Sequence, residues 1–482
     1  MRGALKRKNY KKKTMTNKMK KLFTLLVLCA IGLTGTAQSD LYSYKKLEKA
    51  YRYRVYLKDK KNSPYSVKRP AEFLSQRALE RRGRYGIKVD KHDLPVSPNY
   101  LQVLRDRGLK IHNVSKWQNT AVVETTDTTL MDAVRQMAFV TGVVKVWVGP
   151  DSVLVYEQPD RRKKVKNTRE DLVEHYGSAA DQVKMLNCHL LHDAGFRGQG
   201  MLIGILDGGF NNADVITGFN RANILGTRNF VDPTIDVYSE NSHGMMVLSC
   251  IGANTEGNLV GTAPEAQFYL IQTEDGRSEQ LVEEDNYCAG LEYADSLGCD
   301  VVTASLGYYK FDYPEMNHPY SALDGKTAIN SRSASMAASR GILLLNSAGN
   351  EGNDQWKKIG FPADAKDILA VGAVKSDSLN TDFSSLGYSA DGRVKPDAMA
   401  MGASAAVYST RGTVTTADGT SFACPILCGA VTCLWQAHRD KTPVEIINAV
   451  HRAGHYADRP NEVFGYGIPD MWKAHELLSK KK

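Results

Sequence analysis

The chain has 482 residues, of which 42% are hydrophobic, 24% charged and 9% aromatic. This composition is typical of globular proteins and argues against long disorder, collagen and a polytopic membrane protein. The formal charge of +9 is unevenly distributed: residues 1–38 carry +10, residues 39–169 carry +14 and residues 170–482 carry −15. Because the largest segment is acidic, the positive total does not support a nucleic-acid partner.

Residues 1–38 have the pattern of a secretory signal. Several lysines precede an apolar run over residues 22–33, which is shorter than the roughly 20 residues that a membrane-spanning helix needs. Small residues follow as far as Ala37, as a signal peptidase requires. We therefore expect a signal peptide over 1–38 and export across the inner membrane, to the periplasm, the cell envelope or the exterior. A short buried helix is the alternative, and we expect no transmembrane anchor once the signal is removed.

Residues 39–156 predict a small α+β domain. The expected elements are a strand over 51–58, an Arg-rich helix over 70–84, a strand over 120–124, a short helix over 129–137 and a strand over 143–148. Residues 157–175 contain almost no apolar side chains. Exposed polar segments of this kind are where proteolytic cleavage concentrates, so we expect a linker and processing region there.

From residue 176 to residue 482, short aliphatic runs alternate with helix-length segments. The runs lie at 201–206, 268–271, 301–306, 342–345 and 368–374. This pattern predicts an α/β domain whose mostly parallel sheet is flanked by helices on both faces. In such a sheet, functional residues gather at the carboxyl ends of the strands.

Three motifs of this domain carry side chains that can act together. Asp207 in ILDGG follows a buried strand, and His243 in NSHG precedes a helix. Ser421 in DGTSFACP begins another helix, with Pro425 expected in its first turn. Each has a structural alternative when taken alone, as a turn aspartate, a structural histidine or a helix-capping serine. Together they supply the carboxylate, imidazole and hydroxyl of a nucleophilic triad.

A fourth motif, SAGNEG, places Asn350 after a buried strand, where its amide can donate a hydrogen bond to an oxyanion. The four motifs, in this order, resemble those of the subtilisin-like serine peptidases (subtilases), and the resemblance covers residues 185–475. VVTASLGYY resembles the strand of that family that pairs with the substrate backbone. The resemblance implies catalytic roles for Asp207, His243, Ser421 and Asn350, and substrate binding by Ser305, Leu306 and Gly307.

The N-terminal domain acquires an interpretation from the same family. Residues 119–148 resemble the latter half of a subtilase propeptide domain, which acts as an intramolecular chaperone and inhibitor. Such a domain would lay its sheet on the peptidase domain and its tail in the active-site cleft. The opposite charges of the two segments fit this docking.

The expected chemistry needs no cofactor. The family often binds calcium, but no oxygen-rich loop in the sequence stands out as a site, and no metal ligand is assigned. Cys424, Cys428 and Cys433 resemble a metal cluster at first sight, yet their spacing on one helix turns Cys433 away, which favours small buried core residues. One disulfide among the remaining cysteines is left open.

These patterns favour a secreted serine endopeptidase that acts on protein or peptide substrates and carries its own propeptide. Met245 and Met246 replace the residues that are usual after the His-Gly pair of the family. They motivate an alternative, a catalytically weak subtilase fold used as a binding or chaperone module. A lipase or esterase is disfavoured, because no G-x-S-x-G is present and the triad order differs.

Overall fold

The structure is a computed structural model that describes residues 42–156 and 175–480, in two compact units. In the smaller unit, β1 (Tyr42–Lys46) pairs antiparallel with β6 (Ser152–Tyr156). The larger unit holds the described residues of 49–149 and those from 175 onward. The predicted signal peptide, and the predicted linker apart from His175, lie outside the described residues.

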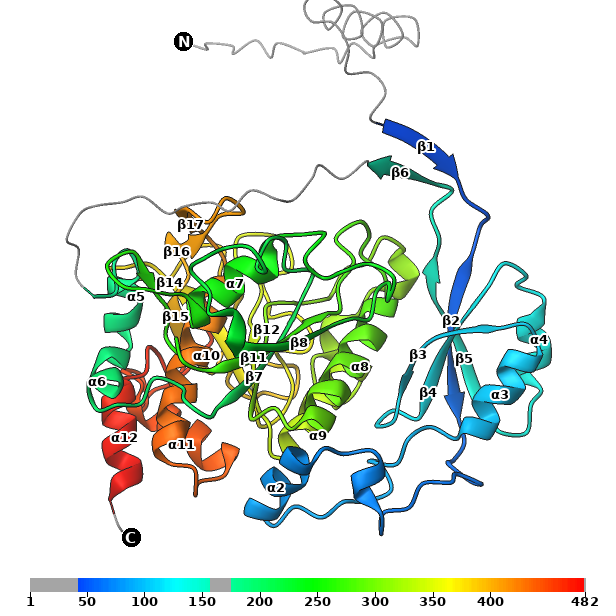
Figure 1. The fold of residues 1–482 in the computed structure, drawn as a ribbon, viewed down its shortest axis with the longest axis horizontal. Helices are drawn as coiled ribbons and strands as arrows, with labels where there is room; N and C mark the ends of the chain where they lie inside the picture. The colour runs from blue at the N-terminus through cyan, green and yellow to red at the C-terminus, as the bar shows by residue number, and fades with distance from the viewer. Residues whose placement is uncertain (1–41, 157–174, 481–482) are drawn as a thin grey trace, which may run out of the picture. The chain divides into compact units, whose positions relative to one another are not determined.

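A seven-stranded sheet forms the centre of the larger unit, and all its neighbouring strands are parallel (Figure 1). The strand order is β15-β14-β13-β12-β7-β11-β8. The strands are β7 (Leu202–Asp207), β8 (Ile224–Asn229), β11 (Gln267–Gln272), β12 (Val301–Ala304), β13 (Leu343–Ser347), β14 (Leu369–Val374) and β15 (Ala398–Met401). The predicted α/β architecture is confirmed, and the five predicted runs are β7, β11, β12, β13 and β14.

Helices cover both faces of this sheet (Figure 1). Alternate residues of a strand point to opposite faces, so Ile203 and Ile205 of β7 enter one apolar core while Leu202 and Leu206 enter the other. The first core is shared with α7 (His243–Gly252) and α10 (Thr420–Ala437). The second core is shared with α8 (Val282–Leu297) and α9 (Ile329–Ser339).

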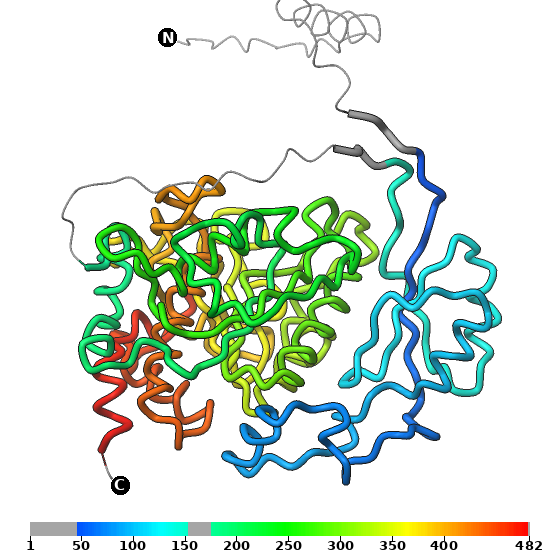
Figure 2. The backbone as a smooth tube through the Cα atoms, in the orientation of Figure 1, coloured from blue at the N-terminus to red at the C-terminus, as the bar shows by residue number. Residues whose placement is uncertain are grey.

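The C-terminal helices pack beside the helices that open the α/β domain. These elements are α5 (Ala180–Met185), α6 (Cys188–Asp193), α11 (Pro443–Ala453) and α12 (Met471–Ser479). Figure 2 shows the chain just after residue 175 lying beside the C-terminal helix, and the Met471 amide donates to the Leu186 carbonyl at 2.9 Å. The two ends of the domain are therefore held together.

By length and composition alone, α10 is long and apolar enough to cross a membrane. Its apolar window is 89% buried within the protein, and the helix contacts β12, β13, β14 and β15. A buried core helix has the same properties, and here the apolar residues of α10 form part of the larger core.

The N-terminal domain is built on a four-stranded antiparallel sheet of order β3-β4-β2-β5. Its elements are β2 (Tyr51–Leu57), η1 (Pro70–Glu72), α2 (Gln76–Arg84), α3 (Pro98–Asp106), β3 (Lys110–Ser115), β4 (Thr120–Thr125), α4 (Leu130–Arg135) and β5 (Val140–Val148). The predicted α+β class is confirmed. The single helix predicted over 70–84 is wrong, because the Ser75 hydroxyl accepts from the Ala78 amide at 3.1 Å and starts α2 after a separate 3₁₀ turn.

One face of this small sheet packs against α8 of the α/β domain. Val122 and Val146 share an apolar core with Leu291 of α8. Arg54 of β2 forms a bidentate ion pair with Asp285 of α8, with both N–O distances 2.7 Å. The sheet of the N-terminal domain therefore lies on the α/β domain, as the propeptide resemblance implied.

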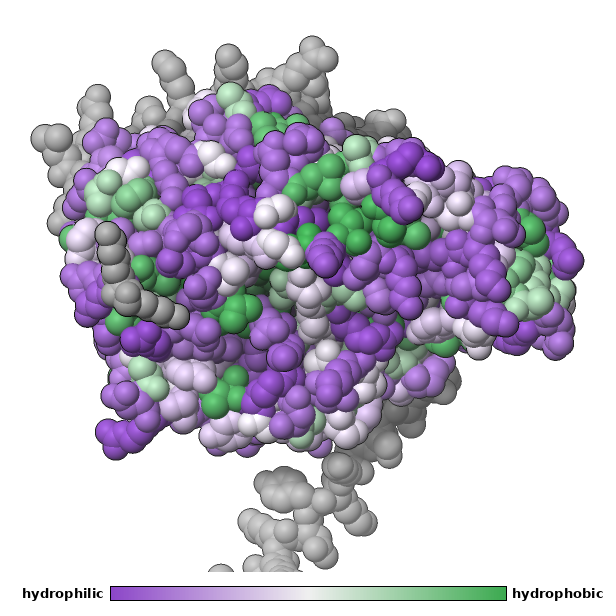
Figure 3. Space-filling model, turned by 90° about the horizontal axis from the view of Figure 1, so that it is seen from below, coloured by the Kyte–Doolittle hydropathy of each residue, from purple (hydrophilic) through white to green (hydrophobic). Residues whose placement is uncertain are grey.

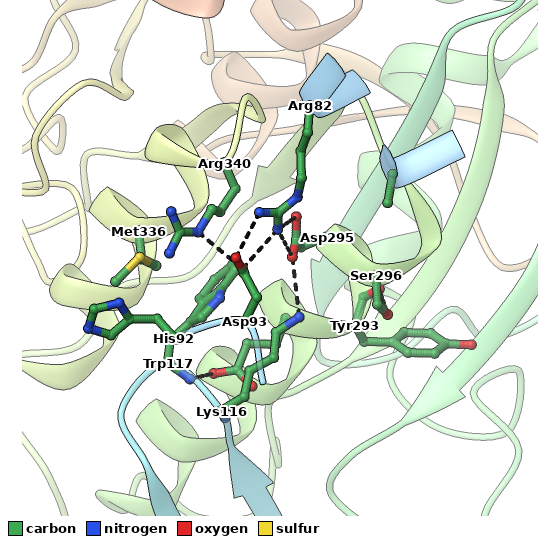
Figure 4. A network of polar contacts seen from close by, with 12 residues as sticks. Arg82, His92, Asp93, Lys116, Trp117, Tyr293, Asp295, Ser296, Met336 and Arg340 are labelled. Carbon is green, nitrogen blue, oxygen red and sulfur yellow. Dashed lines mark hydrogen bonds and ion pairs between the residues drawn. The ribbon is translucent and has the colours of Figure 1, made fainter. Parts of the chain in front are cut away.

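A buried ionic network joins the two domains at the other end of α8 (Figure 4). Asp295 accepts from Arg82 at 2.8 Å and from Lys116 at 3.2 Å, and Arg82 also pairs with Asp93 at 3.0 Å. Burial alone would raise the pKa of Asp295, but Lys116, Arg81 and Arg82 lower it to about 2. Basic groups of the N-terminal domain therefore meet acidic groups of α8.

The surface of the protein is predominantly polar on the face drawn in Figure 3, where apolar atoms form separate patches. The exposed large apolar side chains come from distant parts of the sequence: Val67, Val103, Val144, Leu225, Tyr320, Leu379, Tyr388, Val444 and Tyr456. Scattered exposure of this kind is normal for a folded domain.

Candidate active site

Asp207 and His243 are paired at the carboxyl end of the central sheet. Asp207 ends β7 and is fully buried, while His243 is the first residue of α7. The His243 Nδ1 atom lies 2.9 Å and 3.0 Å from the two carboxylate oxygens of Asp207. Because Nδ1 faces the carboxylate, Nε2 is the ring nitrogen left for a reacting group.

Gly244 allows this close approach of α7 to β7. A Cβ atom at position 244 would lie 2.6 Å from the Gly209 carbonyl oxygen and 2.9 Å from the Asp207 Cβ atom, closer than real Cβ contacts come. The Gly244 amide instead donates to the Gly209 carbonyl at 2.9 Å. The HG pair of the motif is therefore needed to bring the imidazole onto the carboxylate.

The electrostatic environment favours protonation of His243. Burial would lower the pKa of the imidazole, but the charge and hydrogen bond of Asp207 and the nearby charge of Glu274 raise the pKa to about 9. Burial and the charge of Asp207 raise the pKa of Glu274 to about 7. Glu274 follows β11, the strand next to β7, so three ionisable groups meet at this edge of the sheet.

Ser421 lies at the start of α10, as predicted, and is almost completely buried. Its hydroxyl donates to the Ser305 carbonyl at 3.3 Å. Among the described residues no hydrogen bond joins Ser421 to His243, but both line one cavity. The His243 ring also lies 5.6 Å, centroid to centroid, from the ring of the neighbouring Phe422. Ser421 must therefore change rotamer to reach the imidazole.

Pro425 lies deeper in α10 than predicted. The helix begins at Thr420, so Pro425 falls in its second turn, and the expectation that it lies in the first turn is wrong. A proline has no N–H, so the Ser421 carbonyl, four residues earlier, loses its helical partner. The Ser305 hydroxyl supplies a replacement, donating to that carbonyl at 2.8 Å. Ser305 and Ser421 are thus joined by two reciprocal hydrogen bonds.

Asn350 lies just beyond β13, beside the start of α10. Its amide oxygen accepts from the Thr420 backbone N–H at 2.9 Å and from the Thr420 hydroxyl at 3.0 Å. No described residue accepts a hydrogen bond from the Asn350 amide nitrogen. Because the oxygen is held by Thr420, this nitrogen is available to a ligand in the adjoining cavity.

One cavity of about 310 Å³ collects the predicted site residues. It is lined by Asp207, Asn241, His243, Glu274, Ser305, Leu306, Gly307, Ser347, Gly349, Asn350, Glu351, Thr420 and Ser421. Every catalytic and substrate-binding residue predicted from the sequence is in this set. Ser305, Leu306 and Gly307 follow β12, and Gly307 is exposed with open space around its Cα atom.

Two functional side chains of this cavity were missed from the sequence. Thr420 positions Asn350, and its place directly before Ser421 in the motif was the available signal. Glu274 follows β11 at the carboxyl end of the sheet, where functional residues of such folds gather. The sequence alone did not show that β11 lies next to β7.

The hydroxyl, imidazole, carboxylate and amide gathered here form the set of groups that acyl transfer requires. Comparison with protein families matches residues 198–467 to the subtilase family of S8 peptidases. Residues 52–164 match the peptidase S8 propeptide domain of Bacteroidota. The chain therefore belongs to the subtilase family, and it is a serine-type endopeptidase with a propeptide domain.

Individual relatives agree with this assignment. Subtilisin NAT of Bacillus subtilis subsp. natto is 27% identical over 290 residues, which cover 59% of this chain and 68% of that protein. The intracellular serine protease of Paenibacillus polymyxa is 28% identical over 266 residues, covering 52% of this chain and 72% of that protein. The crystal structure of MycP1 with the N-terminal propeptide removed aligns with 61% of this chain and 96% of that chain, at 19% identity and a TM-score of 0.49. The two named relatives are peptidases, so the comparisons do not favour a catalytically weak binding module.

Proposed function

We propose that this protein is an exported serine endopeptidase in which Ser421 is the nucleophile and Asp207, His243 and Asn350 support it. The observation that carries the proposal is the gathering of these four side chains on one cavity, with His243 held by Asp207 at 2.9 Å. The Met245 and Met246 departures do not disturb this pair, because Met245 is buried in the core while the His243 ring faces the cavity.

The mechanism follows from the roles that the geometry allows. The Ser421 hydroxyl turns from the Ser305 carbonyl to His243 Nε2, gives up its proton there and attacks the substrate carbonyl carbon. Asp207 stabilises the imidazolium that forms. The Asn350 amide nitrogen and the Ser421 backbone N–H, at the start of α10, stabilise the oxyanion. His243 then passes the proton to the leaving amine, and water hydrolyses the acyl-enzyme by the same steps in reverse.

Peptide hydrolysis by purified mature protein tests this assignment. Ser421→Ala should lower kcat by about 10⁶-fold, the scale known for removal of the nucleophile from subtilisin. Ser339→Ala is the control, because this exposed serine only bonds the Met336 carbonyl of its own helix. Equal hydrolysis by Ser421→Ala and wild type would refute the nucleophile, and the surviving protein would be a module of another function.

We also propose that the chain is exported by its N-terminal signal and processed between about residues 153 and 176. Support comes from the basic and apolar pattern of residues 1–38 and from the polar segment that follows the propeptide match. N-terminal sequencing of active protein from the producing cells should find the mature chain starting in that window. A mature chain that starts at Ser39 would contradict the processing proposal.

A further inference from the structure

Two cysteines and a histidine that the proposed catalytic mechanism does not use meet in the interior of the α/β domain. Cys188 and His192 lie on α6, and Cys433 lies on α10. Both cysteines are 0% exposed and His192 is 5% exposed. One potential ligand atom from each, Sγ, Nε2 and Sγ, lies within 4.8 Å of the other two. We refer to these three residues as the Cys188–His192–Cys433 cluster.

The backbone carbonyl of Thr262 completes the cluster with a fourth ligand atom. Its oxygen lies 3.0 Å from His192 Nε2, 3.2 Å from Cys433 Sγ and 3.5 Å from Cys188 Sγ. The Cys188 Sγ atom lies 3.6 Å from His192 Nε2. Zinc bonds of about 2.3 Å to sulfur and about 2.0–2.2 Å to nitrogen or oxygen give tetrahedron edges of about 3.3–3.8 Å. The observed separations are already near those edges.

The neighbouring elements hold the four groups in place. Cys188 and His192 are four residues apart, so they share one face of α6. The His192 Nδ1 atom lies 2.9 Å from the Tyr176 hydroxyl, which orients the ring with Nε2 toward the sulfurs, as an outer partner of a metal-bound histidine does. A Cβ atom at Gly429 would lie 2.1 Å from the Thr262 hydroxyl, so glycine is required where α10 meets Thr262.

The charge state of the cluster also suits a cation. Burial raises the pKa of the Cys188 thiol, but a hydrogen bond from Cys433 and the charge of His192 outweigh it and lower that pKa overall. The pKa of His192 is raised by Cys188 despite burial, and the pKa of the Cys433 thiol is raised by burial. The cluster therefore already holds a thiolate in the apolar interior, where a metal ion can replace the proton as its partner.

We propose that Cys188, Cys433, His192 and the Thr262 carbonyl bind one zinc ion. Two sulfurs and an imidazole favour zinc over calcium or magnesium, which prefer all-oxygen sites. Binding deprotonates Cys433 and any protonated His192, and these protons leave to solvent. The ion would link α6, which follows the predicted processing region, to α10, which carries Ser421. Its role would be structural, since all four ligands are buried.

Cobalt substitution and metal analysis of the full-length protein test the proposal. Protein purified without chelator under anaerobic conditions should contain one zinc per chain. Exchange with Co²⁺ should give the thiolate-to-cobalt charge-transfer band and the intense visible bands of a tetrahedral site. Chelation of zinc should lower the thermal unfolding temperature of the wild-type chain.

Matched variants identify the ligands. Cys433→Ala and His192→Gln should each lower bound zinc at least tenfold. Cys428→Ala is the control, because this cysteine is equally buried on the same helix but lies outside the cluster, and its zinc content should match wild type. If the ligand variants fail to fold, the cobalt spectrum of the wild-type chain still decides the proposal.

Two results would overturn it. One is a folded wild-type chain that binds neither zinc nor cobalt. The other is a Cys188–Cys433 disulfide, recognised by mass spectrometry as a cross-linked peptide pair. A disulfide requires the two sulfurs at about 2.05 Å and cannot coexist with binding of both thiolates to one ion.

Discussion

Glu274 is a third carboxylate beside the His243–Asp207 pair, and it gives the site a pH signature. The charge of Glu274 is one of the causes that raise the pKa of His243. Catalysis needs neutral His243, so activity is present above this pKa and is lost as the pH falls through it. Glu274→Gln removes the charge, and the acid limb of the kcat/KM profile should move to lower pH.

The pH profile of mature enzyme on one peptide substrate measures this shift. Glu256→Gln is a suitable control, because Glu256 is exposed and pairs only with His175 among the described residues. An acid limb that stays in place in Glu274→Gln would mean that this carboxylate does not act on His243.

The Asn350 amide should act mainly in the transition state. Removing one oxyanion donor costs about 10²–10³-fold in kcat, a magnitude known from subtilisin. Asn350→Ala should lower kcat by that factor with little change in KM, because the oxyanion forms only after substrate binds. Steady-state kinetics provide the check, and a large rise in KM at unchanged kcat would instead assign Asn350 to substrate binding.

The residues that the sequence revealed are those whose chemistry is written in a local motif. Asp207, His243, Asn350 and Ser421 each follow or begin an element that can be recognised from a few neighbours, and all four line the cavity. The Cys188–His192–Cys433 cluster could not be found this way. Its members come from two helices far apart in the chain, and the packing that joins them depends on the whole fold.

At the scale of elements, the proline in α10 links the helix to the strand beside it. Ser305→Ala removes the hydroxyl that bonds the Ser421 carbonyl, and Pro425 cannot supply a replacement. We expect a loss of about 1–3 kcal/mol in the free energy of unfolding, the cost of a buried unsatisfied carbonyl. In the double variant with Pro425→Ala, the new N–H at position 425 can bond that carbonyl, so the loss should be smaller.

Denaturant unfolding of the two single variants and the double variant gives this coupling directly. Free-energy changes that simply add would contradict the proposed exchange of hydrogen-bond donors. Thermal unfolding of the same set provides an independent check of the order of stability.

The elements that the sequence predicted are the ones with long apolar runs. β7 and β14 are completely buried and were predicted, whereas the edge strand β8 is largely exposed and polar and was missed. β15 is only four residues long, which is too short for a pattern to emerge. The helix predicted over 70–84 was divided by a serine cap that periodicity alone does not detect.

At the scale of the whole molecule, the two oppositely charged segments are joined by buried ion pairs. Asp295 is fully buried and balances Arg81, Arg82 and Lys116 of the propeptide domain. Asp295→Asn leaves these cations without their shared carboxylate, and loss of one partner from a buried ionic group costs about 3–5 kcal/mol. The unprocessed Ser421→Ala chain should lose stability by that amount.

Urea unfolding of this unprocessed chain makes the measurement, with Asp440→Asn as the control. Asp440 is exposed and pairs with Lys441, so its removal should change stability little. Equal stability of the Asp295→Asn and Asp440→Asn variants would show that the network in Figure 4 does not hold the propeptide domain to α8.

The central claim is that Ser421 is an activated nucleophile, and a fluorophosphonate probe tests it most directly. Mature protein should react with one equivalent of probe, and peptide mapping should find the adduct on Ser421. The Ser421→Ala variant should remain unlabelled. Absence of labelling of the mature wild-type protein, or labelling that persists unchanged in Ser421→Ala, would contradict the account.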